Sequence, residues 1–206
     1  MSSNYEDFIH ISRYARYIST ENRRETYADT VDRWWMYMTN KFPSLSKHED
    51  VYKAILNKEV MPSMRTMMAA GDALDRNNIA AYNCSYLSVD DPKAFDEALM
   101  ILMCGTGVGY SVERDSVERL PDVRNHITRT KDVIVVADSK EGWARGLRQL
   151  IMHLYAGEHP TWDLSKIRPA GSRLKTFGGR ASGPEPLDNL FRFVTSAFYK
   201  AQGRKL

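Results

Sequence analysis

The chain has 206 residues, and its 29 Lys and Arg against 26 Asp and Glu give a formal net charge of only +3. Hydrophobic residues make up 43% of it and charged residues 27%, which is typical of a folded globular protein and excludes a disordered or fibrous one. No apolar run reaches 18 residues, the N-terminal segment lacks the features of a secretory signal, and two cysteines are too few for a disulfide scaffold. These properties predict a cytoplasmic protein with neither a membrane nor a nucleic acid as partner.

The first 60 residues predict helices. Apolar and aromatic residues recur at helical spacing between Phe8 and Ile18, and again between Tyr27 and Met38. Pro43 should end the second helix, and a third, shorter helix is expected within residues 44–60. We interpret the aromatic stripe as packing.

Residues 61–81 predict short helices and turns that lead into a strand over residues 82–89. Asp91 suits an N-cap and Pro92 a first helical position, so a largely buried helix should follow over residues 93–104. Gly105 suits the position just after that helix, and residues 108–112 can form a second strand. The segment therefore predicts a β–α–β unit.

The geometry of such a unit predicts two separated sites. The helix returns along the first strand, so the glycine turn at residues 105–109 should face Cys84 at one edge of a parallel sheet. Asp91 should lie at the opposite edge, roughly 20 Å away at ~3.3 Å per strand residue.

The last third predicts a short strand at residues 133–136, a helix over residues 139–155, a basic glycine-rich loop over residues 167–186 and a final helix over residues 187–201. The loop concentrates cations beside glycine and hydroxyl residues. It suits either phosphate binding or simple exposure to solvent.

Cys84 has two interpretations. It is either a small buried hydrophobic residue or a redox thiol that a substrate approaches across the facing glycines. The glycine turn could likewise offer its N–H groups to a ligand or be only a tight turn, and we expect Cys104 to be structural. The five histidines show no metal-ligand spacing, so no metal site is predicted.

Six segments together resemble the N-terminal part of a ribonucleotide reductase, and most closely the monomeric, adenosylcobalamin-dependent (class II) ribonucleoside-triphosphate reductases. They are residues 8–17 (FIHISRYARY), 23–27 (RRETY), 61–67 (MPSMRTM), 83–86 (NCSY), 104–109 (CGTGVG) and 168–184 (RPAGSRLKTFGGRASGP). They follow the family's order and cover nearly the whole chain.

The resemblance implies an α/β fold: N-terminal helices, the first strands of a ten-stranded α/β barrel that is incomplete here, and a largely helical insertion. It divides the chain into a helical region (1–60), the first part of the barrel (61–132) and an insertion-like region near an effector site (133–206). It also implies adenosylcobalamin as cofactor, bound mainly by sequence that is missing here.

By the same resemblance, Cys84 is one of the two cysteines that reduce the ribose and become a disulfide. The residues implied to contact the substrate are Ser63, Met64, Asn83, Thr106 and Gly107. Those implied to bind a deoxynucleoside triphosphate effector are Asp91, Arg173, Lys175 and Arg180.

The radical-bearing cysteine, the second redox cysteine and the C-terminal cysteine pair of the family are missing from these 206 residues. We therefore expect an N-terminal fragment or split subunit, inactive alone, whose partners are a complementary C-terminal fragment, a ribonucleotide and a thioredoxin-like reductant. Two alternatives stay open: a non-catalytic deoxynucleotide-binding module, and a fragment of a reductase of another class.

Overall fold

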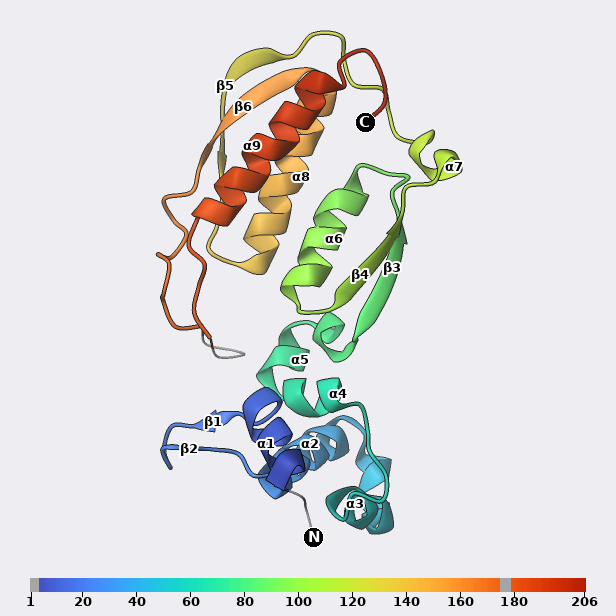
Figure 1. Ribbon diagram of the computed structural model, residues 1–206, viewed down its shortest axis with the longest axis vertical. Helices are drawn as coiled ribbons and strands as arrows, with labels where there is room; N and C mark the ends of the chain where they lie inside the picture. The colour runs from blue at the N-terminus through green and yellow to red at the C-terminus, as the bar shows by residue number, and fades with distance from the viewer. Residues whose placement is uncertain (1–3, 175–178) are drawn as a thin grey trace. The chain divides into compact units, whose positions relative to one another are not determined.

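The structure is a computed structural model that describes residues 4–174 and 179–206 (Figure 1). The described residues form two compact units. The first comprises residues 4–83, with residues 174 and 179 grouped with it, and the second comprises residues 84–173 and 180–206. The two units are defined only by how compactly their residues pack. They do not test the predicted division of the chain at residues 60 and 132, which stays a prediction.

The first unit is built from short helices and one small hairpin. In chain order its elements are α1 (Asn4–Arg13), β1 (Tyr17–Ile18), β2 (Arg23–Arg24), α2 (Tyr27–Lys41), η1 (Pro43–Lys47), α3 (Glu49–Leu56), α4 (Met64–Ala69), α5 (Asp72–Arg76) and η2 (Asn78–Ala81). The predicted first helix was too long, because β1 and β2 form an antiparallel hairpin after Arg13.

Helix α2 organises the core of this unit. Thr26 and Asp29 form a capping box in which each side chain accepts a hydrogen bond from the other residue's backbone N–H, and this fixes where the helix begins. The helix ends before Pro43, as predicted. Its buried face presents Val31 and Trp34 to Ile55, so the predicted role of the aromatic stripe in packing is confirmed.

A buried ion pair lies beside this core. Glu25 is 5% exposed and accepts two hydrogen bonds from the Arg33 guanidinium, at 2.6 and 2.9 Å. Burial raises the pKa of Glu25, but the hydrogen bonds and charge of Arg33, together with the other hydrogen bonds to the carboxylate, lower that pKa below its usual value. Thr30 donates to the same carboxylate at 2.9 Å and lies 3.2 Å from Nε2 of His10, so α1 and α2 share one polar network.

The second unit begins with the predicted β–α–β unit. Strand β3 (Cys84–Ser88) and strand β4 (Gly107–Ser111) pair in parallel, and helix α6 (Lys93–Met103) connects them. Gly105 follows the helix with a φ of +80°, a conformation that glycine adopts without strain. The helix is less buried than predicted: Leu102 is 54% exposed, because α6 carries apolar residues on more faces than α8, β3 and β4 cover.

A second β–α–β unit follows, which the sequence did not predict. After α7 (Arg114–Val117), strand β5 (Thr128–Val135) pairs in parallel with β6 (Glu158–Asp163), and helix α8 (Lys140–Ala156) connects them. The sequence of β6, EHPTWD, has little β-propensity and contains a proline, which is why no strand was predicted there.

Helices α8 and α9 (Glu185–Lys200) lie against the β5–β6 pair and close the main core of the unit (Figure 1). That core contains Leu150, Leu154 and Phe191, each fully buried. The predicted apolar face of the helix over residues 139–155 is therefore confirmed.

The α/β class of the fold is confirmed, whereas the described residues contain only three two-stranded sheets, so a ten-stranded barrel stays an expectation about a larger protein. None of the helices in the described ranges combines the length and apolar character that crossing a membrane requires.

Candidate functional site

The site lies where β3 and β4 begin. Cys84 is the first residue of β3 and stands directly opposite Gly107, the first residue of β4, in the parallel ladder. The prediction that the glycine turn faces Cys84 is therefore confirmed. The two segments are 23 positions apart in the chain, and the returning helix α6 brings them together.

Side-chain alternation assigns Cys84 to the sheet face away from α6. Leu87 packs in the cluster of Val89, Ala94 and Leu120 beneath α6, so the residues at even offsets from Cys84 point to the other side. We call that side the open face, and it is formed by Cys84, Tyr86, Gly107 and Gly109. Cys84 is exposed there and Tyr86 is 68% exposed. A ligand could therefore reach the thiol.

The fold does not require glycine at position 109. A Cβ atom on Gly109 would lie 3.7 Å from the carbonyl oxygen of Ser85 and 3.8 Å from Cδ2 of Tyr86, which are ordinary van der Waals distances. Glycine at this position therefore has no packing explanation within the described chain. Without a side chain at position 109, the open face carries no Cβ opposite Tyr86, two residues along β4 from the partner of Cys84.

The turn next to the open face is tightly packed. Cys104 and Thr106 are 2% and 1% exposed, so Cys104 fits its predicted structural role. Because the Thr106 side chain is buried, contact with a substrate would require this turn to open. Gly107 is exposed, and its carbonyl oxygen accepts a hydrogen bond from the Ser85 hydroxyl at 3.0 Å.

Three predicted substrate residues belong to the first unit. Asn83 is exposed and directly precedes Cys84 in the chain. Ser63 is the N-cap of α4 and accepts a hydrogen bond from the Thr66 N–H at 3.4 Å. Met64 packs against the core around Val31. The structure thus gives Ser63 and Met64 local structural roles, and their contact with a substrate stays a prediction.

Asp91 lies past the far end of β3. Its carboxylate accepts a hydrogen bond from the Lys93 N–H at 2.8 Å just before α6. The predicted start of this helix was wrong by one residue, because Pro92 is the N-cap and the helix begins at Lys93. The predicted separation of Asp91 from Cys84 agrees with the direction of the strand.

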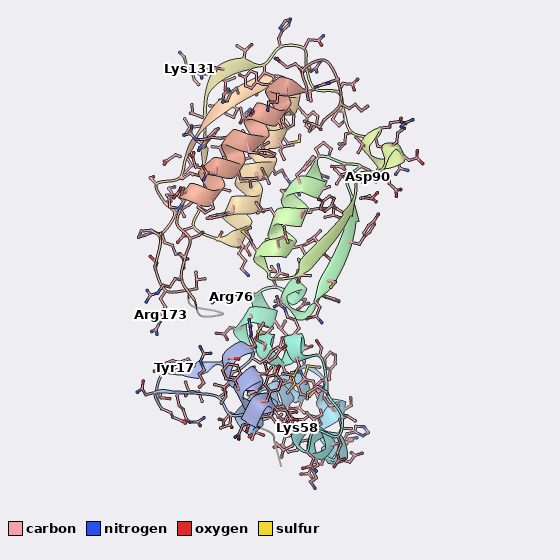
Figure 2. All side chains as sticks on the ribbon, viewed as in Figure 1. Tyr17, Lys58, Arg76, Asp90, Lys131 and Arg173 are labelled. Carbon is pink, nitrogen blue, oxygen red and sulfur yellow. The ribbon has the colours of Figure 1, made fainter. Side chains whose placement is uncertain are left out.

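The basic loop holds two arginines side by side. Arg173 and Arg180 form an isolated antiparallel bridge, and Arg180 donates a hydrogen bond to the Gly171 carbonyl at 2.9 Å. Lys175, the third predicted cation, lies outside the described residues. Figure 2 labels Arg173 at the lower left and Asp90, the neighbour of Asp91, at the right of the second unit. The structure therefore brings the two arginines together but not with Asp91.

An ion pair between a buried carboxylate and a half-exposed arginine joins the two β–α–β units. Asp96 of α6 receives hydrogen bonds from Nε of Arg148 at 2.9 Å, and Nη2 of Arg148 lies 2.7 Å from the same carboxylate. The Asp96 side chain is 7% exposed and that of Arg148 is 42% exposed. The hydrogen bond to Asp96 raises the pKa of Arg148 above its usual value.

Comparison with known proteins identifies the relatives of this chain. The family model for the insertion domain of B12-dependent ribonucleotide reductases matches residues 109–197. An adenosylcobalamin-dependent ribonucleoside-triphosphate reductase of Euglena gracilis is 26% identical, over 97% of this chain and 30% of its own length. The corresponding enzyme of Lacticaseibacillus paracasei is also 26% identical, over 94% of this chain and 36% of its own length.

The chain is similar to class II ribonucleotide reductases over nearly its whole length. These similarities support its assignment to the N-terminal part of such a reductase, as the sequence motifs predicted. A crystal structure of a B12-dependent (class II) ribonucleotide reductase has the same fold, with a TM-score of 0.85 at 23% identity over 97% of this chain and 37% of that chain. The chain thus spans about a third of the length of the curated reductases that it matches.

Proposed function

We propose that this reductase relative acts as the N-terminal part of an adenosylcobalamin-dependent ribonucleoside-triphosphate reductase and supplies Cys84 as one of its two reducing thiols. The observation that carries the proposal is the open face. It holds an exposed thiol at the start of β3, in register with Gly107 and beside a glycine at position 109 that packing does not require.

The reaction needs two electrons, and thiols can supply them. The C2′–O bond of the ribose breaks, a C2′–H bond forms, and the oxygen leaves as water. Two thiols provide the two hydrogens and the two electrons and end as a disulfide. Cys104 is not on the open face and is 2% exposed, so we assign the second thiol to sequence outside this chain.

The cofactor belongs to the larger enzyme in this proposal. Adenosylcobalamin, when bound, supplies the radical that starts the reaction, and we place that radical on a cysteine outside this chain. The four residues of the open face include no imidazole and no carboxylate, so this face suits an organic ligand rather than a metal ion. A nucleotide lying across Gly107 and Gly109 would bring its ribose to the Cys84 thiol.

Reconstitution with a complementary C-terminal fragment and adenosylcobalamin tests the role of Cys84. We expect Cys84→Ser to abolish steady-state formation of deoxyribonucleotide, while Cys104→Ala, the matched cysteine control, retains turnover. Gly109→Ala should fold normally yet raise KM, because its methyl group would project onto the open face. Sustained turnover by Cys84→Ser would refute the assignment.

A second function, binding of a regulatory deoxynucleotide, is favoured by one observation. Like charges placed directly opposite each other on paired strands repel, yet Arg173 and Arg180 face each other across their bridge. A triphosphate between them would remove that repulsion. In this proposal, Lys175 adds a further cation, and Asp91 contributes only if the basic loop moves toward it.

Equilibrium binding of dATP to the full chain tests this second function. We expect the double substitution Arg173→Gln and Arg180→Gln to weaken binding at least tenfold. The control double variant, Arg114→Gln and Arg145→Gln, removes the same charge from exposed positions and should bind normally. Equal loss in both variants would show a general charge effect and no site.

A further inference from the structure

Three potential metal ligands converge in the second unit, away from the open face. They are Asp132 of β5, His153 of α8 and Glu158 of β6. One ligand atom of each residue lies within 4.8 Å of the ligand atoms of the other two. Each comes from a different element of the second β–α–β unit, so the group exists only once that unit has folded.

An irregularity in β5 positions Asp132. The register of the β5–β6 ladder shifts between Arg129, which pairs with His159, and Val133, which pairs with Thr161. Three β5 residues therefore stand opposite the single residue Pro160, and such bulges redirect side chains. The Thr161 hydroxyl donates a hydrogen bond to the Asp132 carbonyl at 3.2 Å and holds this segment in place.

The other two groups meet where α8 ends. His153 lies in the last turn of the helix, and Nδ1 of its ring is 2.6 Å from the Glu158 carboxylate. Gly157, with a φ of +86°, ends the helix in a left-handed conformation and directs the chain into β6. The C-terminal end of a helix carries partial negative charge, so it adds to the attraction of two carboxylates for a cation.

We propose that Asp132, His153 and Glu158 bind a divalent transition-metal ion such as Zn²⁺. One imidazole nitrogen and two carboxylate oxygens are a ligand set that Zn²⁺ accepts, with water in the remaining position, whereas Mg²⁺ and Ca²⁺ prefer oxygen ligands alone. Metal bonds of about 2.0–2.1 Å at tetrahedral angles need ligand atoms roughly 3.3 Å apart. The His153–Glu158 separation of 2.6 Å must widen and the other two separations, which are no larger than 4.8 Å, must narrow, so modest side-chain rotations bring the three groups to that spacing.

The competing interpretation is an ion pair between His153 and Glu158 alone. An ion pair has no need of Asp132, which is exposed on the strand surface, whereas a metal site loses a ligand without it. Asp132 therefore distinguishes the two interpretations. Its substitution by asparagine also leaves the core untouched, so the variant should fold.

Titration of the full chain with ZnCl₂, followed by calorimetry, tests the proposal. We expect one Zn²⁺ per chain with a micromolar Kd, and at least tenfold weaker binding for Asp132→Asn and for His153→Ala. His48→Ala removes an exposed histidine of the other unit and should bind normally. Replacing Zn²⁺ with Co²⁺ should give d–d absorption bands that disappear in Asp132→Asn.

Several outcomes would overturn the proposal. Binding only at millimolar Zn²⁺ would show ordinary surface coordination. Unchanged affinity in Asp132→Asn would leave only the His153–Glu158 ion pair. Equal losses in His48→Ala and His153→Ala would place the metal elsewhere. Circular dichroism of each variant separates loss of binding from loss of folding. The zinc titration uses neither nucleotide nor adenosylcobalamin, so its result does not depend on whether the proposed reductase function is correct.

Discussion

Replacing Asp96 with asparagine should loosen the contact between α6 and α8. The substitution keeps the size of the side chain but removes its charge, and its NH₂ group faces the donors of Arg148 where a carboxylate oxygen accepted before. These helices belong to different β–α–β units of the second compact unit, so the loss of their contact should lower the stability of that whole compact unit.

The magnitude follows from the exposure of the two partners. Removing one partner of a fully buried ion pair costs about 3–5 kcal/mol, whereas exposed pairs contribute about 0.2–1 kcal/mol. Asp96 is 7% exposed, but Arg148 is 42% exposed, so water can rehydrate the stranded guanidinium. We therefore expect a loss of about 2 kcal/mol in the free energy of unfolding.

Urea unfolding can measure this loss. In a background with Trp34→Phe and Trp35→Phe, the remaining tryptophans, Trp143 and Trp162, report on the second unit. With an m-value of about 2 kcal/mol/M, Asp96→Asn should lower the midpoint by about 1 M.

Asp90→Asn is the matched control for this measurement. It breaks a pair with Arg119 whose side chains are 34% and 69% exposed, and it should shift the midpoint by less than ~0.5 M. Equal shifts for the two variants would refute the reasoning. Adding Arg148→Met to Asp96→Asn should recover part of the lost stability, because it removes the guanidinium that Asp96→Asn leaves without its partner. A double variant that recovers no stability would also refute the reasoning.

Three further predictions follow from individual residues. Iodoacetamide should modify one thiol per native chain, since Cys84 is exposed and Cys104 is 2% exposed; a second fast-reacting thiol, or one that persists in Cys84→Ser, would contradict this. Burial lowers the pKa of His10 below 6.5, so the folded first unit binds fewer protons than the unfolded one. The urea midpoint of this unit should therefore fall as the pH drops below about 6.5, and the fall should be smaller in His10→Gln. Gly142→Ala should lower the free energy of unfolding by about 1–3 kcal/mol, because the new Cβ would lie 2.3 Å from the Ala137 carbonyl oxygen. This cost should exceed the gain from the better helix propensity of alanine, and an unchanged melting temperature would refute the prediction.

The sequence predicts the first β–α–β unit well because topology leaves few choices. Once a strand, a helix and a strand follow one another, parallel pairing places Gly107 beside Cys84, whatever the details of packing. The helix predicted over residues 139–155 was equally clear, since one apolar face runs through Leu147, Leu150 and Leu154, and the structure has it at Lys140–Ala156.

What the sequence does not predict depends on tertiary contacts. Strand β6 has the composition of a loop, and it is a strand only because β5 pairs with it and Pro160 is buried against the core. The group of Asp132, His153 and Glu158 has no spacing signature, because a bulge and a helix end bring its members together. The sequence showed that α6 is apolar on most of its faces. It did not show how much of that apolar surface the rest of this chain covers.

The order of the two β–α–β units has a consequence for biosynthesis. In each unit the partner strands are only 23 to 30 positions apart, and the helix between them is a local structure. Closing such short loops costs little entropy, and contacts of this range form early. As the chain leaves the ribosome, β3–α6–β4 can therefore close before β5–α8–β6 is synthesised, and the Asp96–Arg148 pair can form only when the second helix arrives. The nascent chain would thus assemble the second compact unit in steps, with the ion pair forming after the first β–α–β unit has closed and before α9 is added.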